Sequence, residues 1–360
     1  MGIRRVVYFS AVAIAALGPV SAVGQVAAKK TAAAKNTAAA NTAAAKNAAA
    51  IKAWRLDSRT GLTGTWVNNS ATPLERPEQL KGRQSLTDAE VEDMKRRADR
   101  IFKNGHSDFA AGDAIFLATL ADVERYRNPN ATDDSAGMAP WEFDNRTSLI
   151  TDPPDGRLPP YTPEGARRRD AAAAAALIRK PPAGPEELTP MQRCITWGVP
   201  MIRPSSYTRY FQITETPDFA IIVMESIHDA RIIPLDGRPH LPANVRTWNG
   251  DSVGRYEGDT LVVDTTNFSP KANFLGAAGN LHLVERITRV APDEIRNEIT
   301  VDDPETWTRP WTLVLRLKRT EEKMYEVACN EGNGETIEVI LSAARQSDRA
   351  AKEAASKPSK

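Results

Sequence analysis

Hydrophobic and polar residues alternate with a period of two through most of the chain beyond Cys194. In residues 311–318, for example, the odd positions hold Trp and Leu, and the even positions include Thr, Arg and Lys. Such alternation is typical of β-strands that are buried on one face. It predicts nine short strands, at 210–214, 219–225, 228–234, 255–257, 260–267, 281–290, 294–301, 311–319 and 324–329.

Short turns separate these segments, and Gly258-Asp259 is a hairpin signal between two of them. Parallel strands need long crossover connections, so the pattern predicts an antiparallel meander. Closure or strong coiling would protect its edge strands. We therefore predict a mainly β fold whose meander closes into a lipocalin-like barrel or forms a strongly coiled sheet, with a sandwich as the alternative. A further short strand is predicted at 62–67, where Gly64-Thr65-Trp66 resembles the first strand of lipocalin-like barrels.

The preceding region, 54–190, is rich in helix signals and proline and is predicted to pack on the sheet. Thr87 and Glu90 form a capping box that predicts a helix to about 103, and a second helix is predicted over 109–126. Pro163 is suited to the first turn of another helix. The five prolines of 146–163 exclude a continuous helix, so this segment is predicted to be an ordered strap. The β domain is predicted to span 191–345.

The first residues have the pattern of an export signal. Two arginines precede an apolar stretch at 6–20, and Val20-Ser21-Ala22 resembles a signal-peptidase site. The pattern predicts a signal peptide at 1–22, no stable membrane span after its removal, and a periplasmic or secreted protein; a retained anchor is the alternative. Residues 23–53, rich in Ala, Lys and Asn, are predicted to be a disordered tether, or an envelope-associating tail. A disordered tail is predicted at 346–360.

Composition narrows the class of protein. The 47 basic residues almost balance the 46 acidic ones, which argues against nucleic acid as a partner. Two cysteines exclude an all-cysteine zinc site or a four-cysteine iron–sulfur cluster. In an exported protein two cysteines are expected to pair, so Cys194 and Cys329 are predicted to form a disulfide, with a reactive thiol as the alternative.

Four sequence blocks carry a family resemblance. They are RTSLITDPPDGRLPPYTPE, TPDFAIIVMESIHDARIIPLDGRPHLP, TWNGDSVGRYEGDTLVVDTTNF and NLHLVERITRVAPDEIRNEITVDDPETWTRPWT. With these blocks the chain resembles an uncharacterised family of exported bacterial proteins, over roughly residues 54–345. The resemblance implies export but brings no settled reaction with it, so it assigns no role to any residue.

Ionisable residues are dense within the predicted strands and turns of 225–285. Strand alternation places His282 with Val284 and Arg286, and Glu285 with Leu283 and Ile287. Carboxylates, imidazoles and an arginine in an apolar cavity are typical of acid–base catalysis. The predicted catalytic residues are His228, Arg231, Asp264, His282 and Glu285, and the predicted substrate-binding residues are Glu225, Arg238 and His240.

Each role has a competing interpretation. Asp236-Gly237-Arg238 is a turn sequence, and the polar residues at 228–231 also suit a turn-stabilising cluster. His228, His240 and His282, with Glu225 or Glu285, could bind a divalent metal, but their spacing matches no metal motif, so no cofactor is predicted. Gly-x-Ser-x-Gly and a glycine-rich phosphate loop are both absent from the sequence.

Three functions follow from this composition of the predicted sheet. The first is an exported hydrolase, lyase or isomerase that acts by acid–base chemistry on a small, partly apolar molecule in a cavity of the sheet. Here His228 and His282 would move protons, Asp264 or Glu285 would orient them, and Arg231 would hold an oxygen of the substrate. The alternative is a non-catalytic β-barrel protein that binds a small ligand, with its histidines outside the pocket. The third is an envelope scaffold that exposes Trp248, Trp307 and Trp311.

Overall fold

The computed structural model describes residues 60–102, 112–124, 141–176, 182, 184–200, 202, 209–325 and 333–355. The chain divides into two compact units, Met1–Asp57 and Ser58–Lys360, and every described residue belongs to the second. The predicted signal peptide and tether therefore lie outside the described residues.

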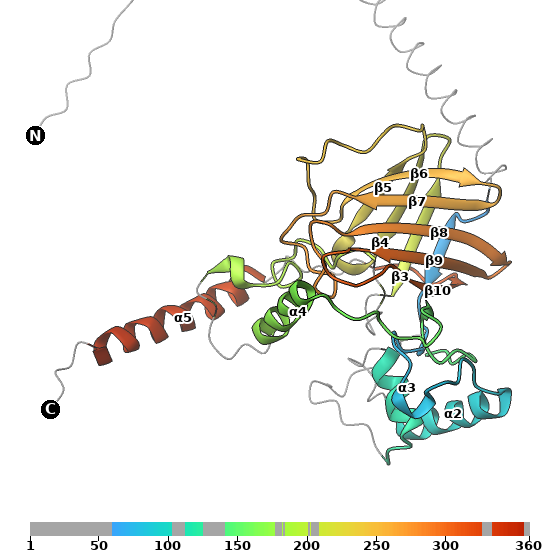
Figure 1. Ribbon diagram of the computed structural model, residues 1–360, viewed down its shortest axis with the longest axis horizontal. Helices are drawn as coiled ribbons and strands as arrows, with labels where there is room; N and C mark the ends of the chain where they lie inside the picture. The colour runs from blue at the N-terminus through green and yellow to red at the C-terminus, as the bar shows by residue number, and fades with distance from the viewer. Residues whose placement is uncertain are drawn as a thin grey trace, which may run out of the picture. The chain divides into compact units, whose positions relative to one another are not determined.

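An antiparallel sheet of ten strands dominates the second unit (Figure 1). Its order is β5-β4-β3-β1-β10-β9-β8-β7-β6, and β2 pairs with β10 in addition. The predicted mainly β, antiparallel fold is thus confirmed. The strands are β1 Gly64–Val67, β2 Ile150–Asp152, β3 Tyr210–Glu215, β4 Phe219–Met224, β5 Ala230–Pro234, β6 Asp251–Glu257, β7 Thr260–Thr266, β8 His282–Ala291, β9 Glu294–Asp302 and β10 Trp311–Thr320.

Alternation along each strand fills the inner face of the sheet. On β10, Trp311, Leu313, Leu315 and Leu317 are all buried, and they belong to one large apolar core to which most strands contribute. The β6–β7 hairpin turns at Gly258, whose φ of +60° suits glycine. Periodicity and turn chemistry therefore account for the main part of the sheet.

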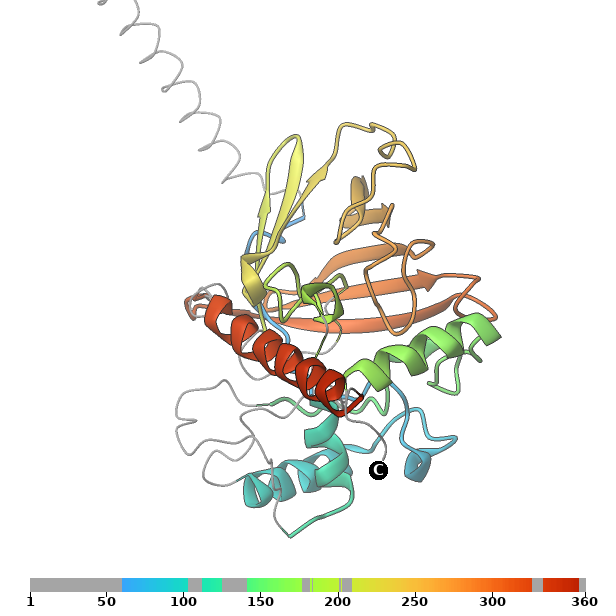
Figure 2. The same cartoon turned by 90° about the vertical axis from the view of Figure 1, so that its left-hand side faces the viewer.

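The sheet is not closed into a barrel, so the prediction of closure is wrong. β5 and β6 are its two ends, and no backbone pairing joins them in the described residues. β5 is only five residues long and ends at Pro234, which has no N–H to donate. The two ends nevertheless meet through side chains, because Ile233 and Leu235 lie directly against Gly254. Figure 2 shows the curvature, with β3–β5 in yellow turning away from β8–β10 in orange.

β1 comes from the N-terminal half and lies between β3 and β10. Thr65 is opposite Gln212 on one side and Thr320 on the other. The strand joins the β3–β5 meander to the β6–β10 meander and occupies the edge of β10 that a strand at 324–329 would need. Residues 324–325 are not in a strand, and 326–329 lie outside the described residues.

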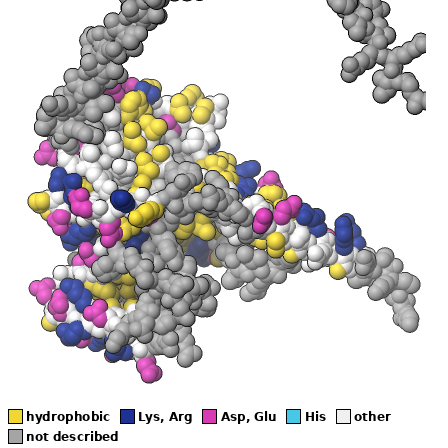
Figure 3. Space-filling model, turned by 180° about the vertical axis from the view of Figure 1, so that it is seen from behind, with side chains coloured by type: hydrophobic (Ala, Val, Ile, Leu, Met, Phe, Trp, Pro, Cys, Tyr) yellow, Lys and Arg dark blue, Asp and Glu magenta, His cyan; other side chains and the backbone are white. Residues whose placement is uncertain are grey.

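The predicted helices and strap are present. The helices are α2 Asp88–Ile101, α3 Gly112–Leu120 and α4 Pro163–Ala176. Three short 3-10 turns that were not predicted are also present, η1 Glu78–Leu80, η2 Pro185–Glu187 and η3 Ser226–His228. Thr87 and Glu90 form the predicted capping box. Acidic and basic side chains are interspersed on the helical region in Figure 3, and Lys95–Glu92 and Arg96–Asp93 pair along α2. Strand β2 belongs to the strap, and Tyr161 of the strap forms an isolated β-bridge with Trp307.

The C-terminal helix α5, Asn333–Ala355, is not among the predicted elements. The helix includes the last residues of the predicted β domain and most residues of the predicted disordered tail. Its Ala, Glu and Arg residues favour helix, but it has few large apolar residues, and Val339 is 68% exposed. Its amphipathic pattern is nevertheless clear, so a signal for this helix was present in the sequence.

Candidate functional site

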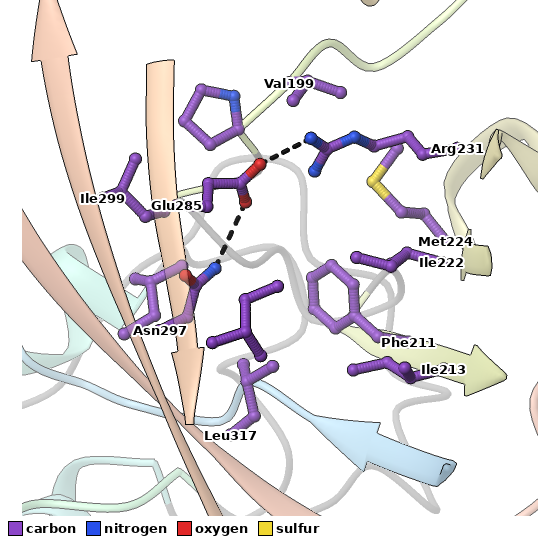
Figure 4. Close-up of a pocket in the computed structure, with 13 residues that line it drawn as sticks. Val199, Phe211, Ile213, Ile222, Met224, Arg231, Glu285, Asn297, Ile299 and Leu317 are labelled. Atoms are coloured by element: carbon purple, nitrogen blue, oxygen red, sulfur yellow. Dashed lines mark hydrogen bonds and ion pairs between the residues drawn. The ribbon is translucent and has the colours of Figure 1, made fainter. Parts of the chain in front are cut away.

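The inner face of the sheet contains a buried ion pair. Arg231 Nη2 lies 2.5 Å from Glu285 Oε2, and the two side chains are only 7% and 4% exposed. Arg231 belongs to the end strand β5 and Glu285 to β8, which is two strands from the opposite end of the sheet. The pair therefore bridges the interval between the two ends from inside (Figure 4).

Neutral polar groups complete this cluster. Arg231 Nη2 also donates to Thr265 Oγ1 at 3.2 Å and to Ser252 Oγ at 3.3 Å. Asn297 Nδ2 donates to Glu285 Oε1 at 3.3 Å. Hydrogen bonds of this kind satisfy the remaining polar atoms that a buried ion pair leaves.

The ion pair forms the polar end of a small apolar cavity of about 30 Å³. Two buried atoms at this end, Arg231 Nε and Asn297 Oδ1, have no hydrogen-bond partner in the part of the chain that the structure describes. One is a donor and the other an acceptor. The cavity is otherwise lined by Val199, Pro200, Phe211, Ile213, Ile222, Met224, Ile287, Ile299, Leu315 and Leu317 (Figure 4).

A larger cleft of about 220 Å³ adjoins this cavity. Val199 and Pro200 line both spaces and separate them. The segment before them is held in place at Thr196, whose Oγ1 lies 2.5 Å from Asp229 Oδ2 and 2.7 Å from Asn249 Oδ1. The other residues that line the cleft are Thr189, Pro190, Met191, Trp197, Gly198, Trp248, Phe268, Ala272, Asn273, Phe274 and Leu281. Four of these are aromatic and none carries a charge.

The opposite face of the sheet contains a second polar cluster. Asp264 is opposite Val284, whereas Val263 is opposite Glu285, so Asp264 and Glu285 point to different faces. His240 Nε2 and His282 Nε2 each lie 3.0 Å from Asp264 Oδ1. His240 Nδ1 is 2.8 Å from Asp251 Oδ2. The four side chains form a chain of hydrogen bonds on the outer face, which we call the outer His–Asp chain.

The hydrogen bond between His282 and Asp264 shifts the pKa of both groups. The hydrogen bond to Asp264 raises the pKa of His282 above its ordinary value, against the opposing effect of burial. The same hydrogen bond lowers the pKa of Asp264, with a smaller contribution from His240. These directions favour an imidazolium paired with a carboxylate. His282 is 43% exposed, so water screens the pair.

The predicted substrate-binding residues Glu225 and Arg238 have structural partners. Glu225 is buried and accepts from the backbone N–H groups of Arg209 at 3.3 Å and Tyr325 at 3.4 Å. Burial raises the pKa of Glu225. Arg238 pairs with Asp236 in the exposed turn that the sequence suggested, and lowers the pKa of Asp236 to about 2.

The structure thus divides the predicted site residues into two groups. Arg231 and Glu285 meet on the inner face, and Asp264, His240 and His282 meet on the outer face. The side chain of His228 and all of Cys329 lie outside the described residues. The predicted pairing of Cys194 with Cys329 therefore stays a prediction.

Some residues of the inner site were not predicted. Asn297 shares a strand face with Ile295 and Ile299, and a polar residue at such a position was the available signal. Trp197 and Phe274 carry no comparable pattern. The exposed tryptophan patch of the scaffold hypothesis is wrong for Trp307 and Trp311, which are 1% and 0% exposed because they pack edge to face in the core.

Among the described residues, no three His, Cys, Asp or Glu side chains form a group able to hold a metal ion. None of the helices in the same part of the chain combines the length and apolarity that crossing a bilayer requires. No protein-family model matches the chain, and comparison with curated proteins and with solved structures also gives no match.

Proposed function

We propose that this protein binds a small, partly apolar molecule in the aromatic cleft at the open end of its curved sheet. The observation that carries the proposal is the cleft itself, with about 220 Å³ of space, four aromatic side chains and no charged lining residue. Concave, mainly apolar sites with a few polar groups are typical of small-molecule binding. The cavity behind Val199 and Pro200 would extend the site toward Arg231 and Asn297, in the manner of a lipocalin-like protein.

The division of the predicted catalytic residues favours binding over acid–base catalysis. An acid–base enzyme of the predicted kind needs its imidazoles, an orienting carboxylate (Asp264 or Glu285) and Arg231 at one cavity. The register of β7 and β8 instead directs His282 and Glu285 to opposite faces. Neither His240 nor His282 lines the small apolar cavity, the aromatic cleft or the pocket beside Arg231 and Trp248.

The proposal includes export to the periplasm or the medium and a disulfide between Cys194 and Cys329. Mass spectrometry of the protein from its native host gives both results, namely the first residue of the mature chain and the state of the two thiols. An unprocessed N-terminus or two reduced thiols would contradict this part, and would leave ligand binding untouched.

The binding proposal is tested with small neutral aromatic probes such as benzyl alcohol. Saturation-transfer NMR and calorimetry on the full chain should detect binding. Trp248→Ala and Trp197→Ala should each weaken it about tenfold, because each removes a large apolar contact. Tyr325→Ala is the matched control, since the Tyr325 side chain is 71% exposed and lies outside the lining. No binding to the wild type, or equal effects of all three variants, would refute the proposal.

A further inference from the structure

Arg193 lies beside the aromatic cleft. Its guanidinium carbon is 5.7 Å from the centre of the Trp248 ring, and Trp248 is a wall of the cleft. A guanidinium over an indole face is held by cation–π attraction. The stacking fixes the position of the positive charge at the margin of the site.

The side chain of Arg193 has an unused donor among the described residues. Its Nε is buried and has no hydrogen-bond partner among the described residues. The carboxylate of Asp229 bonds to other groups, since its Oδ2 accepts from the backbone N–H of Trp197 at 3.3 Å and lies 2.5 Å from Thr196 Oγ1. Arg231 is the contrasting case, because its charge is matched by Glu285 at 2.5 Å.

The cleft supplies no negative charge of its own. Its polar lining residues are Thr189, Thr196 and Asn273, all of which are neutral. The site thus combines an apolar, aromatic space with one cation at its margin that lacks an internal partner. A buried donor without an acceptor is unfavourable, and a ligand that provides the acceptor removes that penalty.

We infer that the ligand is a small monoanion with a ring, such as an aromatic or alicyclic carboxylate. The ring lies in the cleft against the aromatic walls, and the carboxylate accepts from the Arg193 guanidinium, whose planar fork matches carboxylate geometry. This inference rests on the proposed binding function and adds the chemical class of the ligand and the residue that selects it.

The test compares benzoate with benzyl alcohol, a neutral molecule of similar size, by calorimetry on the full chain. The wild type should bind benzoate about tenfold more tightly at low salt, because a charged hydrogen bond adds to the ring contact. Arg193→Gln should abolish this preference, lowering the affinity for benzoate more than the affinity for benzyl alcohol. Arg193→Lys keeps the charge without the fork and should give an intermediate preference.

The outcomes separate this inference from the proposed function. If the wild type binds both probes equally, or if Arg193→Gln weakens both to the same extent, the anion inference is refuted while ligand binding stands. If neither probe binds the wild type, both fail. Arg255→Gln is the matched control, since Arg255 is exposed on β6, pairs with Glu257 and should leave both affinities unchanged. Circular dichroism of each variant verifies that it is folded.

Discussion

The two faces of the β7–β8 pair show how a one-residue step changes the role of an acidic side chain. Glu285 points inward, is 4% exposed and pairs with Arg231. Asp264 points outward, is 29% exposed and contacts two imidazoles. The inner carboxylate connects β8 to the end strand β5, and the outer one connects two imidazoles on the outer face. Strand parity, more than residue type, therefore decides which carboxylate is structural.

The difference also sets the expected energies. A buried charge that loses its partner remains in a medium of low dielectric, so removal of one member of the pair strongly lowers the free energy of unfolding. A partly exposed charge is screened by water, so its removal lowers the free energy of unfolding only slightly. Four experiments test this contrast.

The largest loss of stability is expected when the buried ion pair of the inner face is broken. Glu285→Leu leaves Arg231 buried without a counter-charge and should lower the free energy of unfolding by about 3–5 kcal/mol. Arg231→Met/Glu285→Leu removes both charges and should recover most of that loss. Urea denaturation followed by circular dichroism gives both values. A double variant that is less stable than the single one would contradict the ion-pair interpretation.

A smaller loss is expected where the two ends of the sheet meet. A Cβ atom on Gly254 would lie 2.8 Å from both Ile233 Cγ2 and Leu235 Cδ2. Gly254→Val should therefore destabilise the protein by about 1–3 kcal/mol through overpacking. Arg255→Val, on the adjacent exposed position, is the control and should change stability by less than about 0.5 kcal/mol. Equal effects of the two variants would mean that the ends do not pack through Gly254.

The outer His–Asp chain should give a small, pH-dependent contribution. His282 has a raised pKa in the folded state, so its contribution is complete below its ordinary value of 6.5 and disappears as pH rises through the folded pKa. Asp264 has a lowered pKa, so its contribution is complete above 3.8 and disappears as pH falls through the folded pKa.

The stability difference between wild type and His282→Gln should thus be largest between about pH 4 and 6.5 and stay below about 1 kcal/mol. Thermal unfolding of both proteins at pH 3, 5.5 and 9 measures this difference below, within and above the window. Asp264→Asn should show the same window. A difference that grows steadily with pH would contradict the pairing of His282 with Asp264.

The smallest effect is expected on ligand affinity when residues of the outer His–Asp chain are changed. His240→Gln and His282→Gln alter the face opposite the cleft, so the affinity for benzyl alcohol should stay within about twofold of the wild type, as for distant, independent sites. Calorimetry under the conditions of the cleft variants provides the comparison. A loss comparable to that of Trp248→Ala would show that the two faces act together.

Local patterns predicted the parts of the fold that local physics determines. The capping box at Thr87 and the alternation on β9 and β10 need only neighbouring residues, and they were identified correctly. The parity of His282 and Glu285 was also evident, although the predicted site combined residues from both faces. The pairing of strands is different, because it depends on which distant strand occupies a free edge of the sheet. For that reason the sequence could predict neither the position of β1 beside β10 nor the absence of pairing between the ends β5 and β6.

The candidate site depends on contacts between distant segments, so the sequence revealed only part of it. Arg231 and Glu285 were both predicted, since charged residues in apolar strands are unusual. The cleft required Trp197, Trp248 and Phe274 to converge from three separate loops, and no spacing between them signals this. Arg193 stacks on Trp248 only after that convergence.

The position of β1 constrains the order in which the molecule can be assembled. This strand is made early, yet its partners are Tyr210–Glu215 and Trp311–Thr320, so it waits for most of the polypeptide to be synthesised before its second hydrogen-bonded neighbour exists. Such distant pairing is slow, because a long loop must close before any contact rewards it. A nascent chain that ends before Trp311 leaves one side of β1 bare and the β6–β10 meander incomplete. The native sheet can therefore be completed only after Trp311–Thr320 has been synthesised.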